Sequence, residues 1–186
     1  MKTAARAPAT LIAVDGIDAA AMLAAARSTL TPRARGGISR WDASGVFQDL
    51  AAAGPDAGAP SARTLLLLYA ADLAFRLRWQ IRPALAEGRT VVAVPYVATA
   101  IAVGRAVGLP ATWLAGLFAF APRPDSRRVV HPSRDAPPTA GVRDGFVGFV
   151  CERMATADRQ ASRRLLEETA ARLRSSESRM MRRPQI

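Results

Sequence analysis

Residues 71–96 read ADLAFRLRWQIRPALAEGRTVVAVPY, and this stretch decides the fold class of the protein. Apolar residues recur at helical spacing from Leu66 to Ile81, which predicts a helix over residues 63–87. Gly88 ends that helix, and a continuous apolar run follows at Thr90–Val94. Such a run is typical of a strand buried on both faces of a parallel sheet. The stretch therefore predicts a helix followed by a parallel strand, the basic unit of an α/β fold.

The flanking sequence continues this alternation. A strand over residues 11–14 ends at Asp15-Gly16, and an alanine-rich helix follows whose first turn Asp18 can cap. Gly36-Gly37 are expected to form a turn. Further helices are predicted over residues 42–53, 98–107, 111–120 and 146–173, with a short strand over residues 128–131. We expect a three-layer α/β fold, a parallel sheet flanked by helices, as a single domain over residues 1–174 with a basic, flexible tail over residues 175–186.

Composition restricts the class of protein further. The net charge is +11, yet Lys2 is the sole lysine, so nearly all the positive charge is arginine. Codon bias in a GC-rich genome explains this composition, and so does an anionic partner such as nucleic acid, a nucleotide or an acidic protein. One cysteine, Cys151, excludes an intrachain disulfide and fits a reducing compartment. The apolar runs are too short to span a bilayer. We therefore expect a cytoplasmic protein.

The stretch quoted above resembles the bacterial thymidylate kinase family. There a helix carrying Ala-Asp-Arg continues to Ile-(Arg/Lys)-Pro-Ala-Leu, a glycine turn and a strand. Other segments match the family in the same order and spacing, from about residue 10 to about residue 130: Val14-Asp15-Gly16-Ile17-Asp18, Arg33-Ala34-Arg35-Gly36-Gly37, Gly108-Leu109, Trp113-Leu114 and Arg123-Pro124-Asp125. The resemblance implies a P-loop-kinase-like fold of the thymidylate kinase type.

The departures from the family lie where phosphate is handled. After Gly-Ile-Asp the family has Gly-Ser-Gly-Lys-(Ser/Thr)-Thr, whose backbone N–H groups and lysine bind phosphates and whose hydroxyl holds Mg²⁺. This chain has Ala19-Ala20-Ala21-Met22-Leu23-Ala24 instead. Met22 carries no charge, and Leu23 cannot bind a metal. We therefore predict no catalytic residue, cofactor or metal, and a degenerate P-loop at Gly16, Asp18, Ala19, Ala21, Met22 and Leu23.

The residues that correspond to the family's nucleotide-acceptor site also differ from the family. The family's Asp-Arg-Tyr corresponds to Val94-Pro95-Tyr96, and the arginine of Ala-Asp-Arg corresponds to Leu73. A residual acceptor pocket would comprise Asp72, Leu73, Phe75, Tyr96 and Thr99. Tyr96 or Phe75 could stack on a base or pack in the core. Possible anion contacts are Arg35, Arg123, Arg127, Arg128 and Arg134.

Other polar residues have simpler interpretations. Asp15 and Asp18 could bind a cation, but turn geometry and helix capping explain both. His131 is the sole histidine and is expected on a surface loop. Cys151 is expected to pack as a small hydrophobic residue.

The favoured function is that of a noncatalytic thymidylate-kinase-like protein, a pseudokinase that acts as a protein-binding or structural subunit and does not bind ATP. Members of the family dimerise through helices that flank the sheet. The resemblance therefore implies a homodimer, or a heterodimer with another protein, through the helices at residues 65–81 and 98–107. The alternative is a nucleotide- or nucleic-acid-binding module that uses the residual pocket or the arginines, with affinity that falls steeply with salt. A third possibility is an active nucleoside monophosphate kinase with a rebuilt phosphate site.

Overall fold

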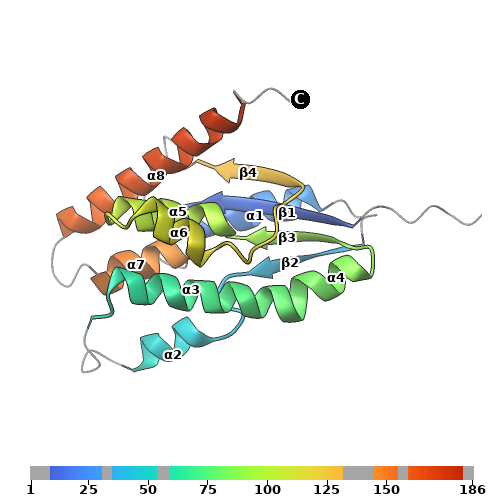
Figure 1. Ribbon diagram of the computed structural model, residues 1–186, viewed down its shortest axis with the longest axis horizontal. Helices are drawn as coiled ribbons and strands as arrows, with labels where there is room; N and C mark the ends of the chain where they lie inside the picture. The colour runs from blue at the N-terminus through green and yellow to red at the C-terminus, as the bar shows by residue number, and fades with distance from the viewer. Residues whose placement is uncertain (1–8, 31–34, 54–58, 132–144, 155–158, 182–186) are drawn as a thin grey trace, which may run out of the picture.

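The computed structural model describes residues 9–30, 35–53, 59–131, 145–154 and 159–181. Within these residues the strands are β1 (Thr10–Gly16), β2 (Gly36–Arg40), β3 (Thr90–Val94) and β4 (Ser126–Val130). They form one parallel sheet in the order β2-β3-β1-β4 (Figure 1). Strands β1 and β3 are therefore central, and β2 and β4 lie at opposite edges. The parallel sheet predicted from the sequence is confirmed.

Helices connect the strands. They are α1 (Ala19–Thr29), α2 (Val46–Ala52), α3 (Ala62–Arg76), α4 (Arg82–Ala86), α5 (Val97–Ala106), α6 (Ala111–Leu117), α7 (Phe146–Met154) and α8 (Arg159–Met181). A π-helical turn, η2 (Leu77–Ile81), joins α3 to α4. None of the helices within the described ranges is long and apolar enough to cross a membrane.

The sheet separates two apolar clusters. On one face, Val14, Val92 and Val94 pack against Met22 and Ala26 of α1. The opposite face contributes to a larger cluster with α3, α5, α7 and α8. Figure 1 shows α1 behind the sheet and α3, α5 and α6 in front of it. Because side chains alternate along a strand, each strand supplies residues to both clusters. The three-layer arrangement agrees with the predicted fold class.

Aromatic rings hold the larger cluster together at one end of the molecule. The rings of Tyr69 and Phe146 lie 4.4 Å apart between centroids, and those of Phe47 and Phe149 lie 5.2 Å apart. Trp41 contacts three of these rings, with centroid separations between 5.0 and 6.1 Å. These contacts join α2, α3 and α7, which are far apart in the sequence.

Gly36 and Gly37 were expected to form a turn, and this expectation is wrong because they begin strand β2. The close approach of neighbouring atoms explains the first glycine. A Cβ on Gly36 would lie 2.8 Å from the carbonyl oxygen of Thr90 and 2.6 Å from Cδ2 of Leu30. Glycine here therefore serves tight strand packing and not a reversal of the chain.

The helices differ from the sequence prediction in three further respects. The helix predicted over residues 63–87 contains the π turn, and the segment predicted as one helix over residues 146–173 is divided between α7 and α8. Helix α8 also continues to Met181, past Ser175 where the tail was expected to begin. The serine hydroxyls there donate to carbonyl groups of the preceding turn, as Ser175 does to Ala171 (3.0 Å). A serine-rich segment can thus remain helical.

Candidate functional site

The carboxyl ends of β1 and β3 meet at Asp15. Its Oδ1 accepts hydrogen bonds from the backbone N–H groups of Tyr96 (3.0 Å) and Thr99 (2.9 Å) and from the Thr99 hydroxyl (2.9 Å). The N–H of Gly16 donates to the same hydroxyl oxygen at 3.1 Å. Burial raises the pKa of Asp15, and the hydrogen bonds oppose that rise. Asp15 thus fastens the end of β1 to the start of α5.

Two residues, Ile17 and Asp18, separate β1 from α1, at the position where the resemblance places a P-loop. The Asp18 carboxylate caps the helix by accepting from the N–H of Ala21 at 2.9 Å, and the N–H of Met22 already donates to the Asp18 carbonyl at 2.9 Å. The Met22 side chain is 2% exposed. A Cβ on Gly16 would lie 3.0 Å from Cγ of Met22. This turn is therefore closely packed, and the amide groups of Ala21 and Met22 are engaged in the helix.

A second close contact covers the start of α1. A Cβ on Gly145, just before α7, would lie 2.9 Å from Cβ of Ala19. The residues assigned from the sequence to a degenerate P-loop are thus held between the sheet, Val130 and the start of α7. Of these, Gly16 and Met22 are buried, and Asp18, Ala19, Ala21 and Leu23 are partly exposed.

Most of the residues assigned to an acceptor pocket are buried. Leu73 and Thr99 are fully buried, and Tyr96 is 2% exposed and donates its hydroxyl to the carbonyl of Pro122 at 2.7 Å. Asp72 is also buried and accepts from the backbone N–H and hydroxyl of Ser44, both at 2.9 Å. Phe75 differs, because its side chain is 38% exposed on the outer side of α3. A base could stack on Tyr96 only if the groups that cover its ring moved away.

The structure also reveals a buried arginine that sequence reasoning missed. Arg76 of α3 was not singled out from the sequence, but its side chain is fully buried. Its guanidinium donates to the hydroxyl (3.0 Å) and carbonyl (2.7 Å) of Ser39 and to the carbonyl of Pro95 (3.0 Å). It lies three residues after Leu73, one helical turn on the same side of α3. This spacing was the feature of the sequence that could have indicated the burial of Arg76. Because Arg76 is buried, it does not contact a ligand directly.

The arginines expected to contact anions lie in different parts of the molecule. Arg35 precedes β2 at one edge of the sheet, whereas Arg127 and Arg128 belong to β4 at the other edge. Arg123 lies before β4, and Arg134 falls outside the described residues. Two arginines not singled out from the sequence, Arg105 of α5 and Arg172 of α8, line the same groove as Arg127 and Arg128.

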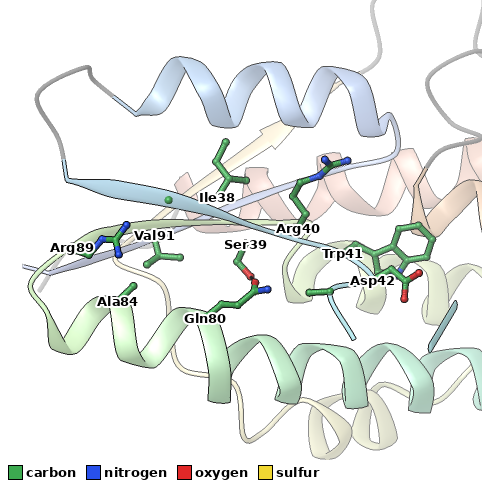
Figure 2. Close-up of a pocket in the computed structure, with 11 residues that line it drawn as sticks. Ile38, Ser39, Arg40, Trp41, Asp42, Gln80, Ala84, Arg89 and Val91 are labelled. Atoms are coloured by element: carbon green, nitrogen blue, oxygen red, sulfur yellow. Dashed lines mark hydrogen bonds between the residues drawn. The ribbon is translucent and has the colours of Figure 1, made fainter. Parts of the chain in front are cut away.

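That groove, with a volume of about 890 Å³, is the larger of two described on the surface, and it runs between α5, β4 and α8. The smaller one, about 460 Å³, follows the outer edge of β2 beside η2 and α4. Figure 2 shows Ser39 and Gln80 pointing toward each other across it, joined by a hydrogen bond of 2.8 Å. Arg40 and Arg89 lie at its sides, and Gly37 and Ala84 leave it open because their side chains are absent or small.

Acidic and thiol groups within the described ranges make no group of three or more metal-ligating side chains. His131 contacts Glu177 through Nε2 and Oε2 at 2.9 Å, on the surface after β4. Cys151 is buried, and burial raises the pKa of its thiol to about 11, so the thiol stays protonated at neutral pH.

Comparison with known proteins adds the following. No family model matches this chain. A probable thymidylate kinase from Pyrococcus horikoshii is 44% identical over 59 residues, and one from Pyrococcus abyssi is 42% identical over 59 residues. Each match covers 32% of this chain and 29% of the relative. The chain therefore matches less than a third of the length of these relatives. The crystal structure of thymidylate kinase from Ehrlichia chaffeensis superposes with a TM-score of 0.58 at 18% sequence identity, covering 75% of this chain and 85% of that one.

These findings place the protein among the α/β folds of the P-loop kinase type, with a parallel sheet between layers of helices. Within that class the chain is thymidylate-kinase-like, as its partial sequence similarity and its fold both indicate. The resemblance stated from the sequence is confirmed at this level.

Proposed function

We propose that this protein is a noncatalytic thymidylate-kinase-like subunit that binds a protein partner through the outer face of α3. The observation that carries the proposal is an exposed apolar stripe on α3 and on the π turn η2 that follows it. Leu67 is 52% exposed, Phe75 38% and Trp79 64%. Large apolar side chains exposed side by side are typical of an interaction surface.

The packing of the β1–α1 turn supports the noncatalytic part of the proposal. Phosphoryl transfer depends on positive charge and backbone donors aimed at the transferred group. Here the Asp18 carboxylate caps the helix at the point where a phosphate would bind, and Met22 is buried beside Gly16. A phosphate at this turn would find the amide groups of Ala21 and Met22 already bonded and no lysine to neutralise its charge.

The stripe is continuous because of helical spacing. Leu67, Ala71, Phe75 and Trp79 follow one another at intervals of four residues, which places them on one side of a helix. In a regular α-helix this spacing drifts around the axis, since one turn takes 3.6 residues. The wider π turn at Leu77–Ile81 opposes that drift. Trp79 therefore stays on the same side as Phe75.

The charges around the stripe indicate the chemistry of the partner. Between Ala62 and Ala86 the exposed charged side chains are Arg63, Arg78 and Arg82, and the one carboxylate of this segment, Asp72, is buried. A second copy of the chain docking through α3 would place arginines opposite arginines. A partner that surrounds an apolar patch with Asp and Glu would complement the surface. We therefore propose a heterodimer with an acidic partner.

The second helix named by the family resemblance, at residues 98–107, fits this role less well. The corresponding helix α5 packs against α3, α6 and α8, and its residues Thr99, Ala100, Ala102, Val103 and Gly104 are buried. An interface of the proposed kind thus involves α3 and not α5. The cytoplasmic location inferred from the lone cysteine belongs to the same proposal.

Catalysis is tested by calorimetry with MgATP and dTMP alongside a coupled kinase assay on the full chain. We expect no turnover. Saturable MgATP binding accompanied by phosphoryl transfer to dTMP would overturn the proposal, because a charge elsewhere would then have replaced the missing lysine. Binding without turnover would leave it standing.

The interface is tested with a photo-crosslinking residue at position 79 in the native cell, and with a matched one at position 120. Phe120 suits the control because it is 40% exposed, close to the 38% of Phe75, but lies outside α3. We expect a crosslinked partner at position 79 only, with acidic residues around the contact. The partner is then purified, and its affinity for this chain is measured. Trp79→Ala should weaken binding about tenfold, equal to about 1.4 kcal/mol, and Phe120→Ala should leave the affinity unchanged. Equal effects of the two variants, or a homodimer by sedimentation at micromolar concentration, would refute the proposed partner.

A further inference from the structure

The groove between α5, β4 and α8 has the dimensions of a small-molecule site. Its volume of about 890 Å³ falls in the range of about 300–1,000 Å³ that such sites occupy. Val97, Ile101 and Val129 form an apolar floor, and Asp15 places the groove beside the carboxyl end of β1. Ligands of parallel α/β folds bind at the carboxyl ends of the strands.

The groove gathers positive charge from elements that are distant in the sequence. It is lined by Arg105 of α5, Arg127 and Arg128 of β4, and Arg172 of α8. Neither Arg105 nor Arg172 forms an ion pair with any residue in the described part of the chain. The Arg128 side chain lies on the α1 face of the sheet, where its guanidinium donates to the Ser28 hydroxyl at 3.4 Å. Arginines brought together in this way repel one another, and an anion between them would relieve the repulsion.

The acidic groups of the groove do not cancel this charge. Glu177 is engaged with His131 at 2.9 Å. Asp15 already accepts three hydrogen bonds, and burial raises its pKa, which favours its neutral form. The hydroxyls of Ser175 and Ser176 donate to carbonyl groups of α8 at 3.0 and 2.7 Å. Arg105 donates one hydrogen bond to the Leu109 carbonyl at 3.3 Å, so its other N–H groups and those of Arg172 are the donors available to an anion.

We propose that this groove binds a small phosphate-bearing ligand of nucleotide size through Arg105 and Arg172. Guanidinium groups bind phosphate through paired hydrogen bonds, which makes phosphate the anion that best suits an arginine cluster. The apolar floor would take the uncharged body of the ligand. The groove has no exposed aromatic ring for stacking successive bases, because Tyr96 is buried, and this disfavours single-stranded nucleic acid.

The site is separate from the β1–α1 turn. Its donors are side chains of α5 and α8, whereas a P-loop binds phosphate through backbone amides and a lysine at the start of α1. The described residues offer no carboxylate cluster that would hold Mg²⁺ in the groove. Binding is therefore expected without Mg²⁺, in contrast to the MgATP binding of a kinase.

The probes are inorganic pyrophosphate and ADP, titrated into the full chain by calorimetry in EDTA at low salt. We expect one saturable site for each probe, with tighter binding of ADP because its nucleoside adds apolar contact. Arg172→Gln should raise the dissociation constant about tenfold or more, and Arg105→Gln should have a similar effect. The matched control is Arg164→Gln, an exposed arginine of α8 that does not line the groove. The unfolding midpoints of all three variants are measured to show that they fold.

Several outcomes would overturn the inference. They are no binding of either probe, an absolute requirement for Mg²⁺, or an equal loss of affinity in Arg164→Gln. A ten-nucleotide oligothymidylate that binds far more tightly than ADP, and does so through the same arginines, would also overturn it in favour of nucleic acid. Kinase turnover would overturn the proposed function. It would not overturn this inference if Arg172→Gln left the turnover unchanged. The two proposals can therefore fail independently.

Discussion

The buried carboxyl group of Asp15 gives a prediction in which charge and hydrogen bonding have separate effects. Two variants divide them. Asp15→Asn removes the charge but keeps an oxygen that can accept from Tyr96 and Thr99, whereas Asp15→Ala removes the acceptor as well. We expect the asparagine variant to be at least as stable as the wild type at neutral pH, and the alanine variant to be much less stable.

The size of the alanine effect follows from the donors that lose their acceptor. The backbone N–H groups of Tyr96 and Thr99 would be left unpaired in the core, while the Thr99 hydroxyl keeps the Gly16 carbonyl at 3.2 Å. A buried donor without a partner costs about 1–3 kcal/mol. Two such donors give a loss of about 2–6 kcal/mol in the free energy of unfolding.

The pH dependence has a definite sign. Burial raises the pKa of Asp15 above its ordinary value of 3.8, so the folded state binds this proton more tightly than the unfolded state. The stability from this group is therefore fully present below pH 3.8 and is lost as the pH rises through the folded-state pKa. The asparagine variant has no such titration. Its advantage over the wild type should grow as the pH rises and then level off.

The assay is urea unfolding followed by circular dichroism at pH values from 4 to 8, with the slope of each transition checked for constancy. Parallel pH profiles of the wild type and Asp15→Asn would refute the raised pKa. An asparagine variant as unstable as the alanine variant would show that the hydrogen bonds need the negative charge. Either result would require a different account of how β1 is fastened to α5.

Other variants test the packing, each by urea unfolding. Gly104→Ala should cost about 1–3 kcal/mol, because its Cβ would lie 2.5 Å from Cδ2 of Leu114, and a neutral effect would mean that the leucine moves freely. Phe146→Ala should cost about 3–5 kcal/mol through loss of the aromatic cluster, and a loss below 1 kcal/mol would contradict its central place. Arg76→Ala should destabilise more than Arg76→Met, which fills the space without a buried charge, and the reverse order would show that methionine does not fit the space. Met22→Lys should lower stability by several kcal/mol without conferring kinase turnover, and a stable, active variant would contradict the packing of the β1–α1 turn.

Long periodic patterns allowed much of the fold to be predicted from the sequence. The strand at Thr90–Val94 lies where its apolar run placed it, and the cap at Asp18 is present. Gly36 was misinterpreted because a glycine pair is common in turns, while its use here depends on Leu30 and Thr90, which approach it only in the folded state. The burial of Arg76 was missed for a similar reason, since its partners at Ser39 and Pro95 come from other strands.

The groove could not be predicted, because it depends on the placement of α8. Arg172 lies in a polar stretch with little to distinguish it in the sequence, and it lines the same groove as Arg105 only because α8 packs along α5 and contacts β4. Family resemblance gave no help, since it ends near residue 130, before α8 begins. The sequence did single out Arg127 and Arg128, but it grouped them with Arg35, which lies at the opposite edge of the sheet.

The β1–α1 turn and the groove differ in how easily each could change its chemistry. At the turn, Met22, Gly16, Ala19 and Gly145 are in close contact, so a larger or charged group at one position disturbs the others. Several residues would have to change together to form a phosphate loop there. The groove can change more easily, since Arg172 is exposed and its replacement leaves the core intact. On physical grounds, then, ligand binding can arise or be lost at the groove without affecting the fold, whereas the β1–α1 turn is held by the same contacts that stabilise the sheet.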